Sequence, residues 1–229
     1  MAKVKFSALI SEMRNKLNGS VFARNRGGAY LRTKVTPLNP QSIAQVAARN
    51  LLTQFSQAWR TLTQAQRDAW NAAVSQFSTT DVFGDVVNPT GAQLYNRLNI
   101  NIANAGGTAI SVPPAPVGAD ALSSLSIDAQ QTGDVFDVTF APGTVPAGHT
   151  LYVESTPCLS PGISNASAQY RAIGTVAAAA TSPADLSTEQ INKFGGLVAG
   201  QKIFIRAKLI NKVTGEVSQS LTASAIVGA

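Results

Sequence analysis

Few residues in this chain have the type and spacing that enzymatic chemistry requires. His149 is the only histidine, and it lies in the segment 146–150, which is rich in turn-forming residues. A histidine base needs an orienting carboxylate and a nucleophile, which the sequence alone does not identify. Because turns that link strands lie on the surface, we expect His149 to be an exposed turn residue.

Cys158 is the only cysteine, so the chain can form neither an internal disulfide nor a zinc site built from cysteines. A nucleophilic thiol has a lowered pKa, caused by a basic neighbour or a helix N-terminus. Neither is evident around residues 156–161, and we expect a half-buried loop thiol.

The carboxylates are sparse and scattered. Asp81 and Asp85 bracket a Phe-Gly pair, and Asp134 and Asp137 could flank the start of a strand. Neither pair has the spacing of a metal-binding loop, so solvated turn residues are the better interpretation. Glycoside cleavage needs a pair of carboxylates about 5–10 Å apart, and only four acidic residues lie in residues 1–110. We expect no enzymatic activity, no metal and no cofactor.

Positive charge is concentrated near the N-terminus. Residues 1–110 hold 12 Lys and Arg against 4 Asp and Glu, a net charge of +8, whereas residues 111–229 carry −2. Ten of the twelve basic residues precede position 61, and Glu12 is the only acid among them. Such a segment favours phosphates or an acidic protein surface beside it.

The basic segment predicts a hairpin. Residues 21–24 and 29–35 have the composition of short strands, and Asn-Arg-Gly-Gly at 25–28 tolerates the positive φ that a hairpin turn requires. Residues 3–6 alternate as in a strand, whereas residues 6–17 fit a helical stripe through Phe6, Ile10, Met13 and Leu17. We expect extended structure at the start and leave the middle open. The residues that we expect to contact a partner are Arg14, Lys16, Phe22, Arg24, Arg26, Tyr30, Arg32 and Lys34.

Residues 39–105 predict three helices. Asn39-Pro40 is a helix start, and capping-box patterns at Thr63 and Thr90 open the second and third helices. Trp59 and Trp70 fall on inward stripes, so core packing is a better interpretation than a ligand platform. The stripe of the first helix consists of Ile43, Ala47, Leu51, Phe55, Trp59 and Leu62.

The Pro-rich segment 111–118 predicts a linker, and the net charge changes sign across it. Alternating segments such as 136–140, 151–154, 202–210 and 221–227 then predict strands. We therefore expect an α+β protein: a basic hairpin and helical domain at 1–110, and a sandwich of immunoglobulin or fibronectin type III character at 119–229.

The run from Gly19 to Arg32, followed by Asn39-Pro40-Gln41 and Gln45, resembles poorly characterised proteins of tailed bacteriophages and prophages. The segments 59–63 and 67–71 belong to the same pattern, and the resemblance covers roughly residues 6–105. It implies a virion component without an assigned activity, and it supplies no functional residues.

The sequence thus favours a virion structural protein that assembles with copies of itself and with other virion proteins. The N-terminus lacks the apolar core of a signal peptide, and no apolar run approaches the roughly 20 residues that span a bilayer. We expect synthesis in the host cytoplasm and no membrane association. The alternative is nucleic-acid binding through residues 1–60, because basic residues interleaved with aromatic ones also suit single-stranded nucleic acid.

Overall fold

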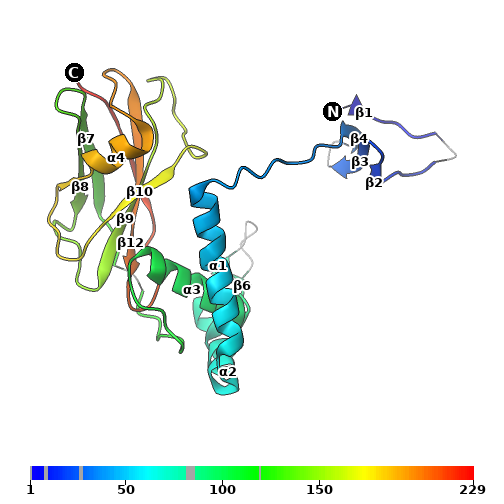
Figure 1. Cartoon of the computed structure of the whole chain (residues 1–229), viewed down its shortest axis with the longest axis horizontal. Coiled ribbons are helices and arrows are strands. Elements are labelled where there is room, and N and C mark those ends of the chain that lie inside the picture. The colour runs from blue at the N-terminus through cyan, green and yellow to red at the C-terminus, as the bar shows by residue number, and fades with distance from the viewer. Residues whose placement is uncertain (1, 8–9, 26–27, 81–85, 119) are drawn as a thin grey trace. The chain divides into compact units, whose positions relative to one another are not determined.

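The computed structural model describes residues 2–7, 10–25, 28–80, 86–118 and 120–229 (Figure 1). It combines helices with antiparallel sheets. The contacts divide the chain into two compact units, Met1–Val46 and Ala47–Ala229. The sequence predicted a division at residues 111–118 instead, and that segment lies inside the second unit.

The first unit is a four-stranded antiparallel sheet in the order β1-β4-β3-β2. Its central hairpin joins β3 and β4, where the register pairs Asn25 with Gly28. Gly28 has a φ of +104°, which glycine adopts without a steric penalty. Arg26 and Gly27 lie outside the described residues. The strand bounds are Ala2–Lys3 for β1, Asn15–Leu17 for β2, Ser20–Asn25 for β3 and Gly28–Thr33 for β4.

The helical part begins with α1. The sequence placed the start of this helix at Asn39-Pro40, but the helix begins at Ile43. Ser42 explains the difference, because its side-chain oxygen accepts from the amide of Gln45 and thereby caps the first turn. The bounds are Ile43–Thr61 for α1, Gln64–Ala73 for α2, Val74–Phe77 for the 3-10 helix η1 and Gly91–Asn104 for α3.

Both predicted capping boxes are present. The hydroxyl of Thr63 accepts from the amide of Gln66 while the Gln66 side chain accepts from the Thr63 amide, and Thr90 and Gln93 repeat this exchange. Each box satisfies two amides that would otherwise lack a partner at the helix start. The short strands β5, Thr79–Thr80, and β6, Val86–Val87, pair between α2 and α3 in the sequence.

Aromatic side chains form the helical core. Tyr95 of α3 lies between Trp59 and Trp70, with ring centroids 5.5 and 5.3 Å away, and Phe55 packs edge-on at 6.4 Å. Trp70 is fully buried, which confirms the core interpretation of this residue. The inward stripe predicted for the start of α1 is wrong, since Ile43 is 91% exposed and Ala47 is exposed as well.

The C-terminal part contains two antiparallel sheets, in the orders β11-β8-β7 and β10-β9-β12-β13, that share one core. Leu151, Ile203 and Leu209 of the larger sheet and Phe136 and Val138 of the smaller sheet are fully buried in that core. The bounds are Ser124–Gln130 for β7, Val135–Ala141 for β8, His149–Ser155 for β9, Arg171–Val176 for β10, Ala184–Asp185 for β11, Lys202–Asn211 for β12 and Leu221–Ile226 for β13. Helix α4, Ser187–Phe194, lies between β11 and β12 in the sequence.

The predicted linker is anchored at both of its ends. At its start, the indole Nε1 of Trp70 donates to the carbonyl of Ser111 at 2.9 Å. At its end, the carboxylate of Glu216 accepts from the amides of Val117 and Gly118 at 3.1 and 3.0 Å. These bonds explain why the helices and the sandwich form one unit although a Pro-rich segment connects them.

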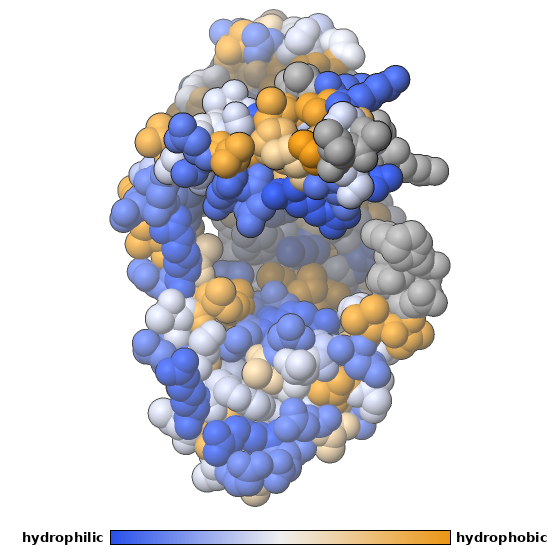
Figure 2. All heavy atoms as spheres, turned by 90° about the vertical axis from the view of Figure 1, so that its right-hand side faces the viewer, coloured by the Kyte–Doolittle hydropathy of each residue, from blue (hydrophilic) through white to orange (hydrophobic). Residues whose placement is uncertain are grey.

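The face of the molecule in Figure 2 mixes polar and apolar residues. Hydrophilic residues cover most of the face seen in Figure 2, and apolar residues lie between them in small groups. Apolar residues on the surface such as Leu38, Ile43 and Val86 are 95, 91 and 69% exposed. Among the described residues, no helix is long and apolar enough to cross a membrane.

Candidate partner-binding site

The first unit presents two chemically different faces. Residues paired directly across an antiparallel sheet point to the same side, so the register defines both faces. Lys16, Val21 and Arg32 form one row across β2, β3 and β4, and Lys3 and Tyr30 lie in the next row. We call the side with these residues the basic face; Ala23, which is paired with Tyr30, belongs to it as well.

Three cations on the basic face point into solvent. Lys3, Lys16 and Arg32 are exposed, whereas Tyr30 and Val21 between them are partly buried. None of the three cations forms an ion pair with any residue that the structure describes. The basic face therefore offers uncompensated positive charge beside one aromatic ring.

On the opposite face, Arg24 belongs to a group of ion pairs around Glu12, which precedes β2. The carboxylate of Glu12 accepts from Arg14 at 2.8 Å and lies 3.7 Å from Arg24. The hydrogen bond from Arg14 is the main reason that the pKa of Glu12 is lowered, and the charges of both arginines act in the same direction. Phe22 and Leu31 are paired on this face and are partly buried.

The described residues of the first unit form no buried interior of their own. None of the residues in Met1–Val46 whose burial is described is buried, and Leu17 is 62% exposed. A small sheet needs a hydrophobic face packed against something to be stable alone, and a unit of this size without a disulfide or a metal usually depends on association. The first unit is therefore short of the packing that would stabilise it in isolation.

The structure divides the predicted partner residues between the two faces. Tyr30, Lys16 and Arg32 lie on the basic face, whereas Phe22 and Arg24 lie on the opposite one. The three remaining residues lie elsewhere: Arg14 pairs with Glu12 before β2, Lys34 follows β4 and donates its amide to Gly19, and Arg26 lies outside the described residues.

His149 contradicts the expectation of an exposed turn residue. It is the first residue of β9, it pairs with Asn211 of β12, and it is only 8% exposed. Its Nδ1 lies 3.1 Å from the carbonyl oxygen of Ala147 and 3.9 Å from a carboxylate oxygen of Asp120. Its Nε2 is buried and has no hydrogen-bond partner in the part of the chain that the structure describes.

The neighbours of His149 in the sequence bond to distant parts of the chain. The neighbouring Thr150 donates its hydroxyl to the carbonyl of Ala105 at the end of α3, and Gly148 accepts from the amide of Lys212. The helical part thus covers this edge of the sandwich, which local turn signals do not reveal.

The cysteine and the aspartates considered as candidates have structural roles or lie outside the described residues. Cys158 is a free, partly buried thiol packed against the sandwich core, as expected. Asp134 lies in the turn before β8, but Asp137 lies within β8, so the prediction of a turn residue is wrong for Asp137. Asp81 and Asp85 lie outside the described residues. No group of three or more potential metal ligands occurs among the residues that the structure describes.

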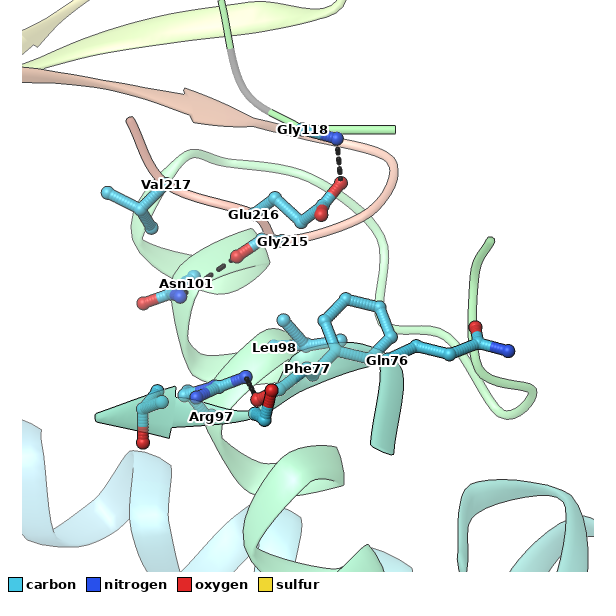
Figure 3. A pocket seen from close by; sticks show the side chains of 11 residues that line it. Gln76, Phe77, Arg97, Leu98, Asn101, Gly118, Gly215, Glu216 and Val217 are labelled. Atoms are coloured by element: carbon cyan, nitrogen blue, oxygen red, sulfur yellow. Dashed lines mark hydrogen bonds between the residues drawn. The ribbon is translucent and has the colours of Figure 1, made fainter. Parts of the chain in front are cut away.

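A pocket lies where α3 meets the loop after β12 (Figure 3). Arg97 lines it and donates to the carbonyl of Phe77 at 3.3 Å, while Asn101 donates to the carbonyl of Gly215 at 2.9 Å. On the other side, the carboxylate of Glu216 accepts from the amide of Gly118. These polar groups are occupied by hydrogen bonds to neighbouring backbone. We therefore interpret the pocket as part of the contact between the helices and the sandwich.

The outer face of β9 and β12 carries a row of cations over aromatic rings that the sequence did not predict. Arg206 pairs with Glu154 at 2.5 Å and lies 4.7 Å from the centre of the Tyr170 ring. Lys208 lies 5.1 Å from the centre of the Tyr152 ring. The hydrogen bond that Arg206 donates to Glu154 raises the pKa of the guanidinium, so this group is charged at every relevant pH. Arg206 and Lys208 thus already interact with partners in their own chain.

The comparisons with known proteins identify no family. No protein-family model matches the chain, and no curated protein matches it. Among solved structures, an Fn3-like protein from Clostridium thermocellum matches with 15% sequence identity and a TM-score of 0.31. The match covers 49% of this chain and 96% of that protein.

Proposed function

We propose that this chain is a structural subunit of a tailed-bacteriophage particle, associated with the capsid or the tail, and that it acts by protein–protein assembly. In this proposal the basic N-terminal unit attaches the chain to a neighbouring subunit. The second unit presents a stable body to its surroundings.

The absence of any buried side chain among the residues of Met1–Val46 with described burial is the observation that carries this proposal. A four-stranded sheet whose apolar side chains are at most partly buried lacks much of the hydrophobic stabilisation that normally offsets the conformational entropy of ordering it. A partner that covers one face supplies this stabilisation. Assembly is therefore the process in which such a unit gains a fixed structure.

Composition and sequence resemblance support the same proposal. Charged residues make up 13% of the chain, about half the usual share, which suits a protein with much of its surface against neighbours. The resemblance of residues 6–105 to proteins of tailed phages and prophages supports a phage particle as the assembly.

We propose further that residues 119–229 form a sandwich of immunoglobulin or fibronectin type III character. Within residues 120–229 the chain has seven strands in sheets of three and four, which is the number typical of these domains. Such modules serve as rigid, exposed bodies, and we assign this role to the sandwich.

The test uses particles purified from the virus or prophage that encodes the chain. We expect mass spectrometry to find the full chain in these particles, and we expect removal of residues 1–36 to abolish its incorporation. A matched control, Arg171→Glu with Lys193→Glu, changes two exposed cations of the second unit and should incorporate normally. Normal incorporation of the truncated chain would exclude the attachment role.

A second function, nucleic-acid binding, is favoured by Tyr30 with Lys3, Lys16 and Arg32 on one face, because an aromatic ring between cations can stack a base. Binding to several phosphates falls steeply with salt, with a log–log slope of about −0.9 for each contact on duplex DNA. A flat salt response, or no binding at low salt, excludes this alternative.

A further inference from the structure

Three aspartates form a row across the smaller sheet of the sandwich. Asp137 of β8 is paired directly with Asp128 of β7 on one side and with Asp185 of β11 on the other. The neighbours of Asp137 along its strand, Phe136 and Val138, are fully buried in the core. Because side chains alternate along a strand, the row of three carboxylates points away from the core. We call this surface the acidic row.

The acidic row has no cationic partner in the described part of its own chain. No ion pair there involves any of its three carboxylates. Like charges at directly paired positions repel one another and destabilise a sheet. Burial raises the pKa of Asp137, and the charges of Asp185 and Asp128 raise it further. The sheet therefore bears an electrostatic cost that an external cationic surface would relieve.

The basic face of the first unit has the matching spacing. Lys16 and Arg32 lie in one row on β2 and β4, with one strand between them. Asp128 and Asp185 lie in one row on β7 and β11, again with one strand between them. Neighbouring strands are about 4.8 Å apart, so both pairs of charges are separated by roughly 10 Å. The two rows are complementary in sign and in length.

We propose that the basic face of one copy docks on the acidic row of a second copy, so that neighbouring subunits are joined head to tail. This inference rests on the proposed assembly function and names the partner. The contact joins two different surfaces of the same chain, and repetition of such a contact builds a ring or an open array. A second copy is the favoured occupant because the chain itself carries the complementary surface and would supply it in every assembly.

The test is a charge-reversal cycle in the full-length chain. One variant carries Lys16→Glu with Arg32→Glu, and the other carries Asp128→Lys with Asp137→Lys. Asp185 is left unchanged because its carboxylate accepts from the amide and hydroxyl of Ser187 and supports the local fold. Self-association is measured by sedimentation over a wide range of protein concentrations, at low and at high salt.

We expect the unmodified chain to associate more strongly at low salt. We expect each two-site variant to associate at least about tenfold more weakly, because like charges would then face one another. The chain that carries all four changes should recover association, since the signs are complementary again. The control with Arg171→Glu and Lys193→Glu has the same net charge as the first variant and should associate like the unmodified chain.

Each variant is also checked for folding by circular dichroism and by the thermal transition of the second unit. Unchanged association of both two-site variants, no recovery in the four-site chain, or pairing independent of concentration would overturn the inference. Binding of a single-stranded DNA oligonucleotide by a chain that does not self-associate would also overturn it. If purified particles contain the chain and the Lys16→Glu, Arg32→Glu variant incorporates normally, the inference fails while the proposed function stands.

Discussion

The side-chain amide of Asn101 in α3 donates to the carbonyl oxygen of Gly215, with 2.9 Å between the two atoms, and joins the helices to the loop after β12. Gly215 has a φ of +73°, and a Cβ added there would collide with the carbonyl group of Leu98. This close approach makes the second unit one body although a Pro-rich segment connects its parts.

Gly215→Ala should lower the free energy of unfolding of the second unit by about 2 kcal/mol or more, because the new side chain meets both backbone strain and a steric clash. Chemical denaturation measures this loss. Gly162→Ala is the matched control, since no atom lies within 4 Å of the added Cβ and its φ is not positive. A loss of the same size in both variants would contradict the proposed role of the close contact between Gly215 and α3.

Thr90→Ala should lower the free energy of unfolding by about 1 kcal/mol, because it removes the hydroxyl that accepts from the amide of Gln93 at the start of α3. Thr90→Ser keeps an oxygen at this position and should retain most of the stability. Equal denaturation midpoints for the Ala and Ser variants would show that the cap contributes nothing.

The raised pKa of Asp137 predicts a pH-dependent effect. Because its folded-state pKa lies above the ordinary value of about 3.9, the folded state favours the protonated carboxyl. The ionised carboxylate therefore destabilises the fold at neutral pH, and this penalty disappears as the pH falls below the ordinary value.

Asp137→Asn should thus raise the free energy of unfolding at pH 7 by roughly 0.5 kcal/mol, and the gain should shrink under acidic conditions. Denaturation at several pH values measures it. Asp68→Asn, at an exposed position on α2, is the control for the loss of one negative charge and should give no comparable gain at pH 7. A gain that grows with acidification would have the wrong sign for this explanation.

Local signals in the sequence predicted much of the fold. The capping boxes at Thr63 and Thr90 depend on residues three positions apart. The alternation in 136–140 marks a strand with one buried side, and 202–210 forms a strand as predicted. The helix start was misplaced because Ser42 provides a cap that the Asn39-Pro40 signal concealed. Strands β7, β10 and β11 were not predicted individually, although 125, 127 and 129 alternate inward.

The two faces of the candidate site could not be predicted from the sequence, because they depend on the register in which the strands pair. The sequence contains the cations of residues 1–46, but only the pairing of β2, β3 and β4 places Lys16 and Arg32 in one row and Phe22 on the other side. The acidic row joins residues 57 positions apart, Asp128 and Asp185, through strand pairing. His149 was misjudged because local turn signals do not show that it begins β9 and pairs with Asn211 of β12.

Amide hydrogen exchange of residues 20–33 tests the central claim most directly, in the dilute isolated chain and in the assembled particle. The account predicts rapid exchange of β3 and β4 in the isolated chain, because no buried core holds them, alongside strong protection of β9 and β12. In the particle it predicts strong protection of β3 and β4 as well. Protection of β3 and β4 in the dilute chain equal to that of β12, unchanged on assembly, would contradict it.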